Sequence, residues 1–180
     1  MESKREELEA LFKTHGFTDF KWIRTEDIVV SQWVRMKCAY GCPTYGRNAT
    51  CPPNLPSVSE CRQFFDEYGT AAIFHFPHSV EKPEDRRARG REINANLLKL
   101  EREVFLSGYQ KAFLLYMAPC NLCGDCLADR AECNNPKFAR PTPEGMAIDV
   151  FSTARQCGYP INVLSDYSQE MNRYAFILVE

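Results

Sequence analysis

The feature that most constrains this chain is a run of cysteines in its second half, Cys120-Asn-Leu-Cys123-Gly-Asp-Cys126. Cys133 follows after six intervening residues, and Pro136 lies just behind it. Consecutive C-x2-C spacings bring three thiolates into one small volume, as in bacterial ferredoxins, where the fourth cysteine follows after three residues and precedes a proline. Zinc sites more often use two separated C-x2-C pairs, or one such pair with two histidines. The pattern favours a cubane iron–sulfur cluster and leaves zinc as the alternative.

A second group of cysteines lies nearer the N-terminus, so that eight of the nine cysteines fall into two sets of four. Turn residues surround both sets, and such turns direct backbone amides at cluster sulfurs. We expect two [4Fe-4S] clusters. The expected ligand sets are Cys38, Cys42, Cys51 and Cys61 for the first cluster, and Cys120, Cys123, Cys126 and Cys133 for the second. Two assignments stay open: Cys61 also fits the apolar face of a helix, and Cys133 could complete the first set instead of the second.

Charge and composition narrow the class of protein. The formal net charge is −2, so no overall basic field attracts the chain to nucleic acid or to an anionic membrane. The first residues are charged, and no apolar run approaches the roughly 18 residues that span a bilayer. We therefore expect a cytoplasmic protein without nucleic-acid or membrane partners. In that reducing compartment nine cysteines favour metal binding over disulfides, which remain the lesser alternative.

Hydrophobic periodicity predicts an α/β protein with a single domain over residues 1–180. We expect a mixed sheet of four or five strands flanked by helices, with cysteine loops at about 36–61 and 119–136. The β-like segments are residues 20–23, 28–34, 71–76, 112–117, 161–164 and 174–179. The expected helices are residues 3–15, a helix from 57 on, residues 83–106 and a helix from 142 on. Ser57 and Glu60 have the spacing of a capping box.

The hydrophobic pattern in the middle of the chain predicts a βαβ unit. Residues 71–76 and 112–117 are apolar runs, and residues 83–106 between them repeat apolar side chains at helical spacing. Such a crossover is right-handed, with parallel strands, in nearly every protein. The unbroken apolar character of residues 112–117 suits a central strand. The second cysteine loop leaves the end of that strand, where α/β proteins usually place their sites, so we expect both loops at one end of the sheet.

Other candidate residues have ordinary structural explanations. Cys157, next to Gly158, is most simply a small buried hydrophobe. We interpret His75 and His78 as structural histidines. Four arginines between residues 86 and 91 stand among acidic residues, which is typical of a solvated helix start. Arg140 has two open interpretations, an ordinary salt bridge or a contact with an anion or a negatively charged cluster.

The chain resembles a bacterial and archaeal family of cysteine-rich proteins, domain-of-unknown-function family 2284. The resemblance rests on three segments: Cys51-Pro-Pro with the following Ser-Glu-Cys61-Arg, the CNLCGDC run with Cys133-x-x-Pro136, and residues 139–150. In the last segment this chain departs from the family pattern, because Thr142-Pro-Glu-Gly-Met replaces part of the family's Arg-Pro-Ser-Met-Glu. The resemblance implies metal binding, most simply as iron–sulfur, and no particular reaction.

These observations support three functional hypotheses. The first is electron transfer through two clusters to an unidentified redox partner protein. The second is an enzyme in which one cluster keeps an open iron that acts as a Lewis acid on a small substrate. Cys61 is the weakest member of its set, which makes the N-terminal cluster the candidate for that open iron. The third is a zinc-stabilised interaction module.

Overall fold

The structure is a computed structural model that describes residues 2–79, 83–166 and 169–180. Within these ranges no helix is both long and apolar enough to cross a membrane. The elements follow along the chain as α1 (Glu2–Thr14), β1 (Phe20–Arg24), the 3-10 turn η1 (Thr25–Asp27), α2 (Gln32–Gly41), α3 (Val58–Asp66), β2 (Thr70–His78), α4 (Pro83–Leu106), β3 (Phe113–Leu115), α5 (Val150–Gln156) and β4 (Met171–Leu178).

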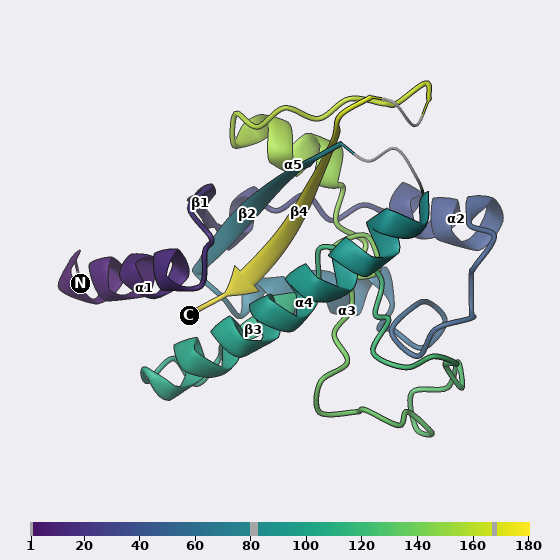
Figure 1. Cartoon of the computed structure of the whole chain (residues 1–180), viewed down its shortest axis with the longest axis horizontal. Helices are drawn as coiled ribbons and strands as arrows, with labels where there is room; N and C mark the ends of the chain where they lie inside the picture. The colour runs from purple at the N-terminus through teal and green to yellow at the C-terminus, as the bar shows by residue number, and fades with distance from the viewer. Residues whose placement is uncertain (1, 80–82, 167–168) are drawn as a thin grey trace.

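Four strands form one sheet in the order β1-β2-β4-β3 (Figure 1). The central pair, β2 and β4, runs antiparallel from Ala71 opposite Leu178 to His78 opposite Met171. The α/β class, the four strands and the flanking helices are as predicted. The strands on either side of α4, β2 and β3, point in the same direction, but β4 lies between them and is antiparallel to both. The expected parallel orientation of these two strands is therefore confirmed, whereas the expected mixed sheet is wrong, because all neighbouring strands of the described sheet are antiparallel.

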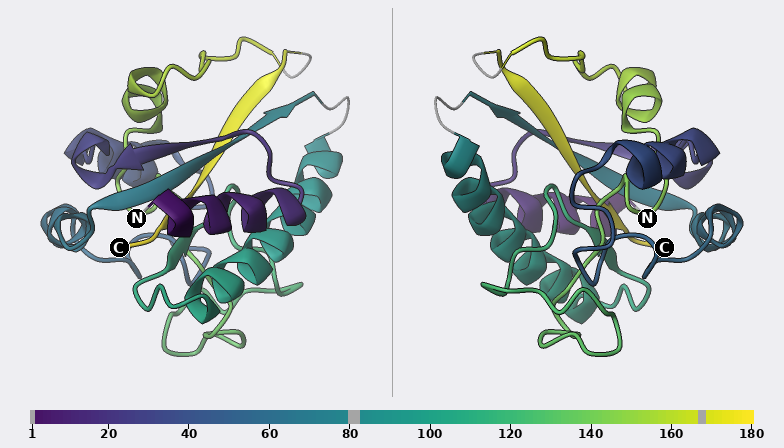
Figure 2. Two further views of the ribbon diagram at one scale, coloured as in Figure 1. Left: turned by 90° about the vertical axis from the view of Figure 1, so that its left-hand side faces the viewer. Right: turned by 90° about the vertical axis from the view of Figure 1, so that its right-hand side faces the viewer.

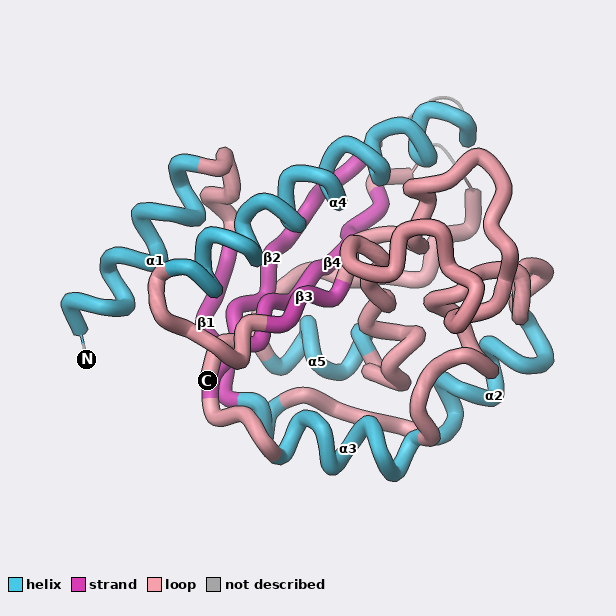
Figure 3. The backbone as a smooth tube through the Cα atoms, turned by 90° about the horizontal axis from the view of Figure 1, so that it is seen from below, coloured by secondary structure: helices cyan, strands magenta, loops and turns pink. Residues whose placement is uncertain are grey.

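The sheet lies between two layers of helices, which Figure 3 shows from below. α1 and α4 cover one face, where fully buried Phe12 and Leu97 pack with Phe74 of β2 and Ile177 of β4. Successive strand side chains point to opposite faces, so the neighbours of these strand residues face the other layer. Each strand therefore contributes to two apolar cores, and burying both faces holds the three layers together.

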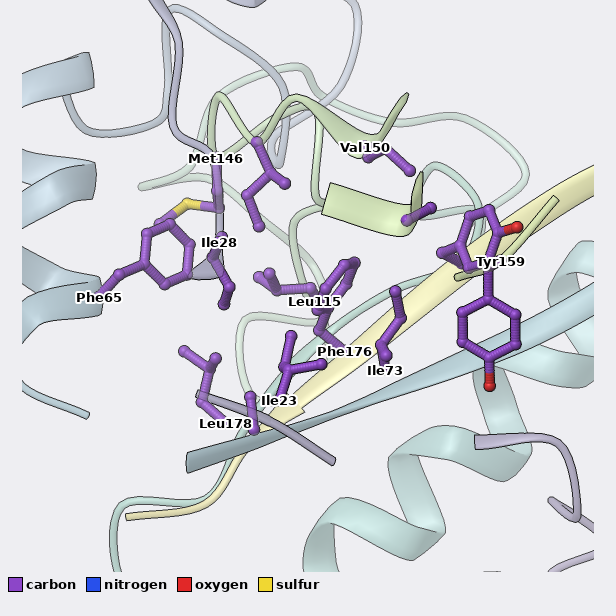
Figure 4. Close-up of a cluster of buried hydrophobic side chains, with 14 of the residues drawn as sticks. Ile23, Ile28, Phe65, Ile73, Leu115, Met146, Val150, Tyr159, Phe176 and Leu178 are labelled. Atoms are coloured by element: carbon purple, nitrogen blue, oxygen red, sulfur yellow. The ribbon is translucent and has the colours of Figure 1, made fainter. Parts of the chain in front are cut away.

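The second core lies between the sheet and the layer of α3 and α5 (Figure 4). Phe65 of α3 and Val150 of α5 meet strand residues such as Ile73 and Phe176. Cys61 belongs to this core and is 0% exposed. Its side chain is therefore enclosed among apolar side chains.

Local sequence signals predicted several helix boundaries correctly. The capping box of α3 is present: the Glu60 amide donates to Ser57 Oγ, and the Ser57 amide donates to the Glu60 carboxylate at 2.7 Å. α1 covers Glu2–Thr14, close to the predicted residues 3–15. Gly158 adopts a left-handed φ of 70° just after α5, the conformation in which glycine commonly ends a helix.

Three predicted elements are wrong. Residues 28–34 form only one isolated bridge, from Val30 to Ile148, before α2 begins at Gln32. The helix expected from residue 142 begins only at Val150, because Ala147 has a positive φ of 61° that breaks helical geometry. Residues 161–164 form no strand. β propensity depends on available partners, and in this fold the described sheet gives the first and third segments none.

β3 lies at the edge of the sheet, not at its centre as expected. Two amides on this side are nevertheless hydrogen-bonded: the Leu114 amide donates to Glu101 Oε1 at 2.8 Å, and the Tyr116 amide beyond the strand donates to Pro141 O at 2.8 Å. α4 and the chain returning from the second cysteine loop thus cover this edge. An edge strand covered in this way can be as apolar as a central one.

Candidate metal centre

The two cysteine loops lie against each other at one end of the molecule, as expected (Figures 1 and 2). Asparagine side chains and one backbone amide make the connection. Three hydrogen bonds join the loops: Asn48 Nδ2 to Cys120 O at 2.6 Å, Asn54 Nδ2 to Ala128 O at 2.8 Å, and the Ala49 amide to Cys126 Sγ at 3.4 Å. Segments about 70 residues apart in sequence therefore build one site.

A cavity of about 500 Å³ opens between the loops. The first loop contributes Cys51 to its wall, and the second contributes Cys120, Cys123, Cys126 and Cys133. Other residues of both loops, Ala139, the start of α4 and one residue of β4 complete the wall. Five thiols from both predicted sets thus surround a single space.

The first set of cysteines is more dispersed. Cys38 lies on α2, and Cys42 is the C-terminal cap of that helix, so the spacing of four puts both thiols on one side. Burial raises the pKa of the Cys38 thiol, and the Cys42 thiol raises it further. Burial also raises the pKa of Cys51 to about 11, with added contributions from Cys42, Cys38, Cys126 and Cys120. Cys51 is therefore the electrostatic link between the two sets.

Cys61 stands apart from the other predicted ligands. Its thiol donates to Pro56 O at 3.7 Å inside the apolar core. Burial raises its pKa, which the Arg35 guanidinium opposes, and the smaller contributions come from charged neighbours on α3. Arg35 itself donates to Pro56 O at 3.0 Å and to Gly145 O at 3.1 Å. The structure thus brings five of the eight predicted ligands to one cavity, places Cys38 and Cys42 within electrostatic reach of Cys51, and leaves Cys61 in the core.

Hydrogen-bond donors point at the sulfurs of the second loop. Asn135 Nδ2 donates to Cys123 Sγ at 3.0 Å, in addition to the bond from the Ala49 amide to Cys126 Sγ. Such bonds stabilise thiolate over thiol and tune the potential of bound clusters. In the sequence, Asn135 is only one of the turn residues around the second set, because nothing local shows which sulfur its side chain reaches.

The second loop is anchored to the long helix α4. Asn94 Nδ2 donates to Ala118 O at 2.9 Å, and Asn121 Nδ2 donates to Arg87 O at 3.1 Å. A Cβ on Gly90 would lie 3.0 Å from the Ala118 Cβ, so glycine permits the close approach of helix and strand end. The start of the cysteine loop is therefore held on a rigid element.

The other candidates have distinct environments. Arg140 forms an ordinary salt bridge with Glu101 at 2.8 Å, so its first interpretation is confirmed. His75 contacts Asp19 and Asn172, each at 2.7 Å, through its two ring nitrogens, as a structural histidine would. Cys157 is only partly buried and packs at the margin of the second core. Arg86 and Arg87 line the cavity, which their interpretation as a solvated helix start did not anticipate.

Comparison with protein families adds an independent result. The model of DUF2284, described as a predicted metal-binding protein, matches residues 21–179. This chain belongs to the DUF2284 family. No curated protein and no solved structure matches it. Both cysteine loops of this DUF2284 protein lie inside the matched range, so metal binding is supported at the level of the family.

The cysteine thiols and the N–H groups near them are chemically suited to a metal ion or cluster, although the thiols do not converge on one point. Among the described residues, no three His, Cys, Asp or Glu side chains converge closely enough to hold an ion. The raised pKa of Cys38, Cys51 and Cys120 means that metal must displace protons from these thiols. The soft thiols, the N–H donors and the cavity are nevertheless what a thiolate-bound metal centre requires in this DUF2284 protein.

Proposed function

We propose that this DUF2284 protein binds two neighbouring [4Fe-4S] clusters and passes electrons to a partner protein. One observation carries the proposal: thiols of both cysteine loops line the same cavity of about 500 Å³. A structural zinc site is closed tightly around one ion by four ligands. A space of this size between five thiols suits a larger inorganic group better than a single ion.

The ligands divide between the loops. Cys120, Cys123, Cys126 and Cys133 would hold the second cluster, and Cys38, Cys42 and Cys51 would hold the first. Bound clusters would supply the one-electron chemistry. The chain would hold the sulfurs, donate N–H groups to them and exclude water. The electrostatic contact of Cys51 with Cys126 supports a short path between the two groups.

Metal analysis tests this proposal directly. Protein purified without oxygen should be brown and contain about eight irons and about eight acid-labile sulfides per chain, the sum of two four-iron clusters. Iron and sulfide assays with a visible spectrum provide the measurement. Colourless protein with stoichiometric zinc, also after anaerobic expression with added iron, would favour the zinc-stabilised module instead.

A second candidate function is favoured by the position of Cys61. With this thiol buried in the apolar core, the first set has three cysteines, and a cluster there would keep one iron without a cysteine ligand. Catalytic metal sites keep such a position for water or substrate. The open iron would serve as a Lewis acid on a small molecule. In this case the first cluster would be catalytic and the second would supply or remove electrons.

Cys61→Ala distinguishes the two candidates. We expect the variant to keep its iron content and paramagnetic spectrum, since the thiol lies in the core, whereas Cys51→Ala should lose about half of the iron. Cyanide should perturb the spectrum of the native first cluster if its open iron is catalytic, and should leave that spectrum unchanged if the cluster only carries electrons. Equal iron loss in both variants, with a three-iron signal in Cys61→Ala, would show that Cys61 is a ligand. That outcome would favour a carrier in which every iron has a cysteine ligand.

A further inference from the structure

The cavity wall contains an unusual group of arginines. Arg47 comes from the first cysteine loop, Arg86 and Arg87 from the first turns of α4, and Arg173 from β4. Among the described lining residues, Asp125 is the only carboxylate. The whole chain carries a net charge of −2, so this is a local cationic region on a slightly acidic protein. Such regions concentrate anions.

The guanidiniums of Arg86 and Arg173 are close enough to oppose each other. Burial lowers the pKa of Arg173, and the charge of Arg86 lowers it further, although Glu144 acts in the opposite direction. Burial also lowers the pKa of nearby His78, with further contributions from Arg89, Arg173 and Arg86. Gathering like charges around one space costs free energy that an anion in the space would offset.

Three of the four arginines form no ion pair with a carboxylate among the described residues. Within the described part of the chain, no carboxylate lies at ion-pair distance from Arg47, Arg87 or Arg173. Among the described residues, the Nε of Arg173 donates only to the weak acceptor Met171 Sδ, at 3.0 Å. Arg140 offers a contrast, because its guanidinium is paired with Glu101. A half-buried guanidinium without such a partner retains donors for a ligand.

We propose that Arg173 and Arg87, with Arg47 and Arg86 beside them, bind a small oxyanion, a carboxylate or a phosphate, in the cavity next to the thiols. The planar fork of a guanidinium matches both groups with two parallel hydrogen bonds. The cavity volume of about 500 Å³ falls in the range of small-molecule sites, roughly 300–1,000 Å³. The inference deepens the proposed function, since the anion would lie beside the metal, but the arginines do not depend on which metal is bound.

The competing explanation is that these arginines only balance the negative charge of a cluster. In that case their removal would change metal retention or reduction potential, yet the protein would bind no added anion. Saturable binding of a small anion at constant metal content separates the two explanations. Inorganic phosphate and succinate are suitable probes because they represent the two oxyanion classes.

The experiment titrates the metal-loaded protein with each probe at fixed ionic strength, by calorimetry and by the spectrum of the metal centre. We expect one saturable site in the native protein, with the tighter probe identifying the oxyanion class. Arg173→Gln should weaken binding by about tenfold or more, since hydrogen bonds to charged groups are the strong ones. Arg102→Gln, which removes an exposed arginine of α4 outside the cavity lining, should change the affinity by less than about twofold.

Every outcome of these titrations either supports or overturns the proposed anion site. Absence of saturable binding of both probes to native protein with full metal content overturns the anion site and leaves the iron–sulfur proposal intact. Equal effects of Arg173→Gln and Arg102→Gln overturn it as well. If Arg173→Gln loses its metal or its fold, the exposed Arg87→Gln replaces it, with the same expected weakening. If metal analysis finds zinc, the iron–sulfur proposal fails, and the same titrations still test the anion site.

Discussion

Replacing Cys123 with serine should remove the second cluster and reduce the iron content from about eight to about four per chain. Cys123 is the central cysteine of the C-x2-C-x2-C run, and its sulfur accepts the hydrogen bond from Asn135 at 3.0 Å. The loss should also loosen residues 119–136, which have no helix or strand of their own. Leu127 in this loop is 57% exposed, so little apolar burial holds the loop without metal. Metal binding then contributes directly to folding.

Iron analysis and limited proteolysis measure these two effects. Cleavage should appear within the loop of Cys123→Ser under conditions in which the native protein resists. Cys157→Ser is the matched control, because this cysteine lies at the margin of the second core and outside the cavity. It should keep full iron and lose only about 1 kcal/mol of stability. Equal iron loss from both variants would refute the division between ligands and bystanders.

Glu101→Gln should lower the free energy of unfolding by about 3–5 kcal/mol, the cost of breaking a buried ion pair. The Glu101 side chain is 7% exposed and that of Arg140 is 21% exposed. The carboxylate also accepts the amide of edge-strand residue Leu114 at 2.8 Å. One side chain therefore joins α4, β3 and the segment that returns from the second cysteine loop. Neutralising the Glu101 carboxylate leaves the guanidinium of Arg140 without its negatively charged partner.

Thermal unfolding at matched metal content provides the measurement. For a chain of this size each kcal/mol shifts the midpoint by about 2–4 °C, so we expect a decrease of roughly 6–20 °C. Glu26→Gln is the control, because Glu26 pairs with Arg24 at an exposed position and should contribute at most about 1 kcal/mol. Adding Arg140→Met to Glu101→Gln should recover part of the loss. Similar midpoints for the two single variants would contradict the structural role of Glu101.

Sequence patterns were most informative where the physics is local. The capping box of Ser57 and Glu60 depends on a few adjacent residues, and it forms as predicted. The long helix α4 and its flanking strands follow from apolar spacing alone. Prediction failed where the formation of a strand depends on a neighbouring strand to pair with. Residues 28–34 have strand propensity, but within the described chain they form only one isolated bridge, from Val30 to Ile148. Nothing in the sequence near β3 shows that β4 separates it from β2.

By itself, the sequence determined that this protein has cysteine sets suited to metal, because C-x2-C spacing constrains thiols through a short stretch of backbone. Only the tertiary structure decided that Cys61 belongs to the apolar core, while Cys51 joins the second loop around the cavity. It also decided that Arg173, more than 80 residues from Arg87, shares that cavity. Contacts of this kind depend on how helices and strands pack across the whole chain, and packing between distant segments leaves no pattern in the local sequence.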